Sequence, residues 1–151
     1  MVVEAIRKLG RLDRRVALLA FLTVQGIKPV SKLDGFEGPD EVVVELLKEL
    51  GLEVEVTREG CKTDILFGSR EALNRYHASE KLKGGEKIKA LGKLFGYPEC
   101  CSRFFAGLME GKAKGKPGKR PPLEHFICPG CKESPQLLEK YLKARRTLKE
   151  L

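Results

Sequence analysis

Two groups of cysteine and histidine residues in this sequence have the spacing of metal ligands. Cys100 and Cys101 are adjacent in the stretch GYPECC, and His125, Cys128 and Cys131 follow in the pattern H-x2-C-x2-C. The Pro-Gly pair inside CPGC favours a tight turn that directs two sulfurs to one point. These residues therefore predict one metal site built from Cys100, Cys101, His125, Cys128 and Cys131.

The spacing leaves the kind of site open. Three cysteines and one histidine would form a tetrahedral zinc site that uses one cysteine of the CC pair. Both cysteines of the pair would raise the number of thiolates to four, which suits an iron-sulfur cluster. A third alternative has no metal, with disulfides among the same cysteines.

A helix over residues 98–110 should carry the CC pair in its first turns, because Pro98 is favoured at the start of a helix. The positive end of the helix dipole there favours thiolate over thiol. Cys101 is in register with an apolar stripe formed by Phe104, Phe105, Leu108 and Met109. We therefore expect Cys100 to bind the metal and Cys101 to pack in the core.

A basic segment, residues 111–122, separates the two groups and reads GKAKGKPGKRPP. Its Gly and Pro content excludes a helix and favours a mobile loop. The expected role is phosphate contact with RNA or DNA, without base readout, because no RNA-binding aromatic signature accompanies it; ordinary solvated surface is the alternative. The candidate nucleic-acid-binding residues are Lys112, Lys114, Lys116, Lys119, Arg120, Arg145 and Arg146.

Charge is unevenly distributed along the chain. Residues 1–80 contain 12 Lys/Arg and 14 Asp/Glu, whereas residues 81–151 contain 17 and 7. The longest apolar run, VALLAFLTV, is too short for a bilayer span and precedes no cleavage pattern, so we expect a cytoplasmic protein with reduced thiols and no membrane partner. The single Asn and two Gln, with abundant Lys and Glu, indicate a thermophilic protein, for which intracellular disulfides stay possible.

Helices and a small sheet should precede the Cys-containing region. A short opening helix, a helix ending at Gly26 and a helix starting at Pro39 are followed by alternating residues 52–57, which indicate a half-buried strand. Residues 63–68 should form a second strand across a REGCK hairpin loop, and a helix begins after Ser69.

The predicted fold class is therefore α+β: N-terminal helices with a small β-hairpin or sheet, followed by a mostly helical Cys-containing C-terminal segment. Gly84 and Gly85 suggest a boundary between an α+β lobe at 1–83 and a helical Cys/His lobe at 86–151. One compact domain is the alternative.

The Cys motifs resemble those of an archaeal family catalogued as a domain of unknown function, with a GYPxCC hallmark followed by HxxCxxC. The resemblance covers residues 91–135 well and the N-terminal lobe only loosely. Gly96, Tyr97 and Pro98, with the two adjacent cysteines, match the hallmark directly. The resemblance implies that the motif acts as a unit and implies no reaction.

Two classes of function follow. The favoured one is a structural metal site, with zinc as the metal, that presents the basic surface to nucleic acid or to a protein partner. The alternative is a thiol-based or iron-sulfur enzyme of sulfur transfer or redox chemistry, with a low-pKa Cys100. No nucleophile-elbow, Walker or HExxH motif is present, so whether the protein is an enzyme stays open.

Overall fold

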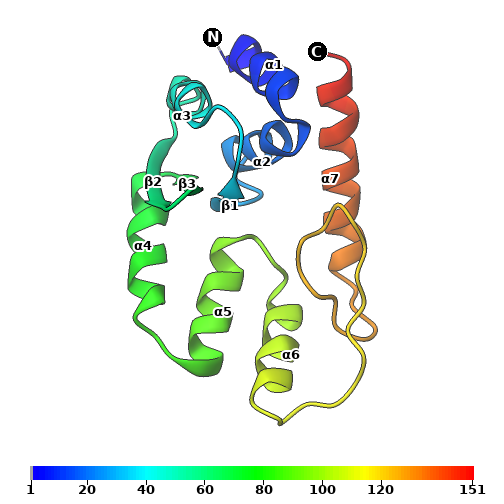
Figure 1. The fold of residues 1–151 in the computed structure, drawn as a ribbon. Helices are drawn as coiled ribbons and strands as arrows, with labels where there is room; N and C mark the ends of the chain where they lie inside the picture. The colour runs from blue at the N-terminus through cyan, green and yellow to red at the C-terminus, as the bar shows by residue number, and fades with distance from the viewer. Residues whose placement is uncertain (1) are drawn as a thin grey trace. The chain divides into compact units, whose positions relative to one another are not determined.

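The structure is a computed structural model that describes residues 2–151. Seven helices and three strands lie in this part of the chain, which confirms the predicted α+β class (Figure 1). The helices are α1 (Val2–Leu12), α2 (Arg14–Val24), α3 (Asp40–Glu49), α4 (Arg70–Glu80), α5 (Gly84–Leu94), α6 (Glu99–Met109) and α7 (Ser134–Lys149). The strands are β1 (Val30–Phe36), β2 (Glu53–Glu59) and β3 (Lys62–Gly68).

These elements form two compact units. The first comprises the residues up to Asn74 together with Ala144–Leu151, and the second comprises Arg75–Lys143. Both α4 and α7 therefore contribute residues to each unit. Leu148, near the end of α7, packs against the core of the first unit. The domain boundary at residues 84–85 stays a prediction.

The first unit contains an antiparallel sheet with the strand order β1-β3-β2. Glu59 pairs with Lys62, so only Gly60 and Cys61 connect β2 to β3. Gly60 has a φ of +62°, as the first of the two central residues of a type II′ turn requires. The predicted hairpin is present, with a two-residue turn in place of the five-residue loop.

Strand β1 is an element that the sequence analysis did not identify. Its apolar residues Val30, Leu33 and Phe36 recur at every third position, not at every second. The register with β3 also shifts between Leu33 and Phe36, as it does at a β-bulge. This irregularity removes the period of two from which strands are identified in a sequence.

Helices α5 and α6 lie side by side in the second unit and are joined by the GYP of the GYPECC motif (Figure 1). Gly96 has a φ of +78°, and its backbone N–H donates to Lys93 O at 3.2 Å. The N–H of Tyr97 donates to Gly92 O at 2.8 Å, which completes a Schellman motif at the end of α5. Pro98 then precedes α6 directly, so the motif ends one helix and begins the next.

Small residues allow these two helices to approach closely. A Cβ at Gly92 would overlap the Ser102 hydroxyl, and a Cβ at Gly85 would meet Glu110 and Ala106. The close approach fixes the start of α6, where both cysteines of the pair lie.

Candidate metal centre

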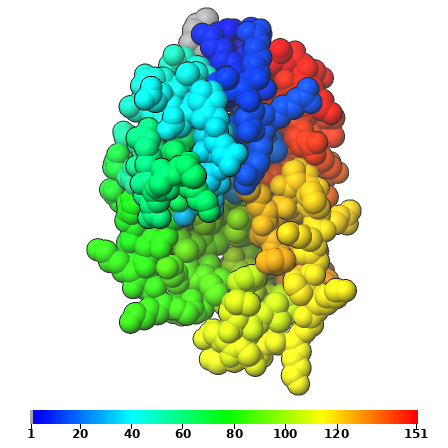
Figure 2. Space-filling view, in the orientation of Figure 1, coloured from blue at the N-terminus to red at the C-terminus, as the bar shows by residue number. Residues whose placement is uncertain are grey.

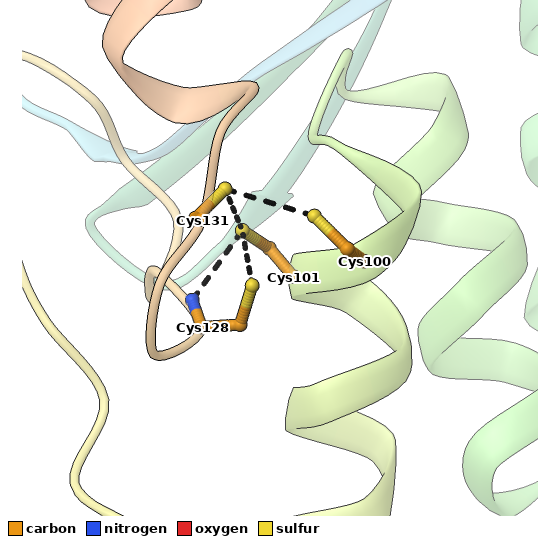
Figure 3. A group of neighbouring side chains, drawn as sticks. All are labelled: Cys100, Cys101, Cys128 and Cys131. Carbon is orange, nitrogen blue, oxygen red and sulfur yellow. Dashed lines mark hydrogen bonds between the residues drawn. The ribbon is translucent and has the colours of Figure 1, made fainter.

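Four cysteine sulfurs lie together at the start of α6 and in the CPGC turn that precedes α7. The sulfurs of Cys100, Cys101, Cys128 and Cys131 all lie within 4.8 Å of one another (Figure 3). The separation is 3.5 Å between Cys101 and Cys131, 3.6 Å between Cys100 and Cys131, and 3.8 Å between Cys101 and Cys128. Four cysteines that the sequence separates into two pairs thus form one group that could hold a metal ion.

The three separations given above are close to those of a single tetrahedral ion. With metal–sulfur bonds of about 2.3 Å, as in zinc sites, neighbouring sulfurs of a tetrahedron lie about 3.8 Å apart. A cluster with several iron atoms places more than one metal between the sulfurs and therefore needs wider separations. All five cysteines of the chain are free, so the structure contains no disulfide in place of the metal.

Helix α6 positions the first two sulfurs. The N–H of Cys101 donates to the carbonyl of Pro98 at 3.1 Å, so both cysteines occupy the first turn. The unpaired N–H groups and positive dipole end of this turn favour thiolates, as a metal site requires. The prediction that a helix begins near Pro98 and carries the pair in its first turn is confirmed.

The CPGC segment forms the expected tight turn and positions the other two sulfurs. The N–H of Cys131 donates to the carbonyl of Cys128 at 3.2 Å, and Gly130 has a φ of +67°. Proline at the second position and a left-handed glycine at the third are the requirements of a type II turn. The turn brings its two end residues to the same side, where they face the sulfurs of α6.

Cys101 does more than pack in the core. Its side chain is 1% exposed, in agreement with the apolar register predicted for it. Its sulfur nevertheless lies at the centre of the group, with Cys128 and Cys131 both within 3.8 Å. The expectation that Cys100 binds the metal while Cys101 only packs does not fit this geometry. Cys101 is buried, but other sulfurs surround its sulfur, so Cys101 also is a candidate ligand.

His125 lies beside the four sulfurs and not among them. Its Nε2 atom is 2.9 Å from Ser134 Oγ. Its side chain is buried, and the centroid of its ring lies 5.1 Å from the centroid of the Tyr97 ring. Because the four cysteines suffice for a tetrahedral site, the structure favours four thiolates over three thiolates and one imidazole. His125 can then support the ligands through Ser134.

Ser134 is the residue that the sequence analysis missed. Its Oγ lies 3.2 Å from Cys131 Sγ and 3.4 Å from Cys101 Sγ, and its backbone N–H donates to Cys131 Sγ at 3.3 Å. A thiolate accepts hydrogen bonds and cannot donate them, so the hydroxyl must donate once these sulfurs are ionised. A serine at the start of a helix was visible in the sequence, but its proximity to the sulfurs was not.

The hydrogen bonds of Ser134 separate the acidities of the thiols. Burial raises the pKa of Cys100, and it raises the pKa of Cys128 to about 11. Burial also opposes ionisation of Cys131, but hydrogen bonds from the hydroxyl and N–H of Ser134, together with those from the thiols of Cys101 and Cys100, outweigh it and lower the pKa of Cys131 to about 6. In the metal-free protein the acidic thiol is therefore Cys131, and not Cys100 as the sulfur-transfer alternative requires.

The basic segment at residues 111–122 is exposed, and it is part of the yellow region at the surface in Figure 2. Its five cations Lys112, Lys114, Lys116, Lys119 and Arg120 are exposed, as are Arg145 and Arg146. The two arginines belong to the first unit. Of the predicted nucleic-acid-binding residues, only the five in the segment therefore lie in the second unit.

The segment is held by backbone pairing. Gly118 and Ile127 exchange two hydrogen bonds of 2.9 Å, N–H to carbonyl in each direction. Gly115 lies against the ring of Phe104 and against Pro129, the second residue of the CPGC turn. The basic segment is thus folded back onto the chain that carries the candidate metal ligands.

No match for this chain was found among protein-family models, curated proteins or solved structures. None of the helices formed by residues 2–151 combines the length and apolar character needed to cross a membrane.

Proposed function

We propose that the second unit is a zinc-stabilised module that binds nucleic acid through its phosphates. The observation that carries the proposal is the group of four sulfurs, whose closest separations of 3.5 to 3.8 Å match a tetrahedral ion. Zinc is the metal of choice because four thiolates in tetrahedral geometry form its usual structural site.

A structural role is favoured over a catalytic one. Four protein ligands leave zinc with no open position for water or substrate. The ligand pairs lie on either side of the basic segment, with Cys101 and Cys128 separated by 27 positions. The metal would therefore close a long loop, and it would hold the basic segment at a defined place on the unit.

The charge of the second unit supports a polyanionic partner. Residues 75–143 contain 15 Lys/Arg and 7 Asp/Glu, whereas the rest of the chain contains 14 of each. Such an excess attracts a phosphate backbone, and each contact displaces a condensed counterion. The proposal therefore includes binding that weakens steeply as salt concentration rises.

Metal analysis tests the first half of the proposal. Protein purified without oxygen should contain one zinc per chain, and chelation should expose four additional thiols to a thiol reagent. Iron together with sulfide would contradict the zinc assignment and favour the sulfur-chemistry alternative. Protein without metal and with fewer than five titratable thiols would contradict the metal site itself.

Salt-dependent binding tests the second half. The substitutions Lys112→Ala, Lys114→Ala and Lys116→Ala together should weaken binding of a 12-nucleotide single strand and lower the slope of log K against log salt by about 0.7 per lost contact. The control is a variant with the same change in net charge in the first unit: Lys8→Ala, Lys48→Ala and Lys62→Ala. Equal effects of the two triple variants would show that overall charge, and not the basic segment, accounts for binding.

A further inference from the structure

A pair of stacked phenylalanine rings lies beside the basic segment. The ring of Phe126 stacks on that of Phe105, with centroids 5.4 Å apart and an interplanar angle of 14°. The ammonium of Lys119 lies 5.4 Å from the centroid of the Phe126 ring. We name these three residues the Phe126 platform.

The platform is exposed although it is aromatic. Phe126 is 40% exposed, although the ring of Phe105 stacks on it. Lys119 also is exposed, and its contact with the ring is of the kind that a flexible lysine can exchange for a phosphate. An aromatic ring and a cation are therefore both exposed at one place.

The chain that carries the metal ligands also holds the platform in place. Phe105 lies one helical turn after Cys101 on α6, and Phe126 lies two residues before Cys128. The backbones of Gly118 and Ile127 pair with each other. Gly118 directly precedes Lys119, and Ile127 directly follows Phe126. A metal bound by the four cysteines would thus fix both rings relative to each other.

We infer that the Phe126 platform stacks one unpaired base of a single-stranded nucleic acid, while Lys119 and the other cations of the basic segment contact its phosphates. Every base has a face that can stack on an aromatic ring, and an aromatic surface next to cations is how proteins bind single strands without reading their sequence. In a duplex the bases are already stacked and paired, so this surface favours a single strand. The inference rests on the proposed function and specifies its ligand.

The experiment compares the zinc-loaded protein, residues 1–151, with its Phe126→Leu variant, using a fluorescein-labelled 12-nucleotide oligouridylate. Leucine keeps an apolar side chain but removes the stacking face. Affinity should fall by about 5-fold to 150-fold, the range for one stacked base, with an unchanged salt slope. Leu82→Ala is the matched control, because Leu82 is 42% exposed in the same unit and distant in sequence from the platform, and it should bind as the wild type does.

A backbone without bases isolates the stacking contribution. A 12-residue abasic strand keeps the phosphates, so the wild type and Phe126→Leu should bind it equally. Equal affinities of these two proteins for the oligouridylate would overturn the inference and leave the proposed function standing. Tighter binding of the wild type to a 12-base-pair duplex than to the single strand would also overturn the inference and leave the proposed function standing. If the protein bound no nucleic acid at low salt, both the inference and the proposed function would be overturned.

A second measurement needs no substitution. Ring-proton resonances of Phe126 in the wild type should move upfield when the oligouridylate is added, because a base stacked on the ring shields its protons. The abasic strand should leave these resonances in place. Equal shifts with both strands would contradict stacking even if the Phe126→Leu variant failed to fold.

Discussion

His125 and Ser134 are joined in the interior of the second unit by a contact of 2.9 Å between Nε2 and Oγ. Ser134 Oγ in turn lies within 3.4 Å of the sulfurs of Cys131 and Cys101. When the sulfurs are thiolates, the hydroxyl donates a hydrogen bond to one of them, and its oxygen can accept a hydrogen bond from Nε2–H of His125. His125, which has the spacing of a metal ligand in the sequence, therefore contacts Ser134 and lies outside the group of four sulfurs. Ser134 in turn is the hydrogen-bond donor to a candidate ligand sulfur.

The first prediction concerns this support. Ser134→Ala should lower zinc affinity by about 10-fold to 100-fold, because groups that hydrogen-bond to metal ligands contribute that much. Competition with a chromophoric chelator measures the change. Ser102→Ala is the matched control: its hydroxyl is buried in the same unit and has no hydrogen-bond partner. Equal affinities of the two variants would contradict a role for Ser134.

The second prediction separates the two possible ligand sets. Cys101→Ser should lose the bound metal, because its sulfur is central to the group of four, whereas His125→Gln should retain one metal per chain at lower affinity. Elemental analysis of each purified variant measures this. Cys61→Ser serves as the control, since Cys61 is exposed in the hairpin turn of the first unit. The opposite result, with metal lost from His125→Gln alone, would restore the set of three cysteines and one histidine.

The third prediction concerns thiol reactivity without metal. Because the pKa of Cys131 is lowered to about 6 and that of Cys128 is raised to about 11, iodoacetamide at pH 7 should alkylate Cys131 much faster than Cys128. The rate at Cys131 should reach half of its plateau near pH 6. Peptide mass spectrometry of samples quenched at short times measures both sites. Equal rates at the two cysteines would contradict the proposed effect of Ser134.

The lowered pKa of Cys131 also predicts how the stability of the metal-free protein changes with pH. The pKa of Cys131 lies below its ordinary value of 9.0, so its stabilising contribution is fully present above pH 9 and is lost as the pH falls through about 6. Metal-free protein should therefore gain unfolding free energy from this group between pH 6 and pH 8. Urea denaturation at the two pH values measures the gain, which Ser134→Ala should reduce.

The fourth prediction concerns the contact between α5 and α6. Gly92→Ala should lower the free energy of unfolding by about 1 to 3 kcal/mol, because its Cβ would overlap the Ser102 hydroxyl in a packed interface. Gly10→Ala is the control: its Cβ would lie 3.9 Å from the nearest atom, and alanine is favoured over glycine in a helix such as α1 by about 1 kcal/mol. Chemical denaturation of the metal-loaded protein compares the two. If Gly92→Ala has the same free energy of unfolding as the wild type, α5 and α6 can move apart without loss of stability, and the prediction is wrong.

Local signals in the sequence were sufficient for the elements near the site. Pro98 predicted the start of α6, and the Pro-Gly pair of CPGC predicted the turn before α7, because proline and glycine restrict the backbone wherever they occur. The irregular spacing in β1 left no such signal. The amino-acid types and their spacing also identified the cysteines as candidate metal ligands, because a Pro-Gly turn directs two sulfurs to one point.

The sequence by itself thus determined the α+β class, the cysteines that could bind a metal and the position of the basic segment between them. Only the tertiary structure decided that Cys101 joins the other three sulfurs, that His125 contacts Ser134 and that Phe105 stacks on Phe126. The reason is physical. Helix periodicity tells which side chains share a face, but which groups of different segments meet depends on how α6, the folded loop and the start of α7 pack together.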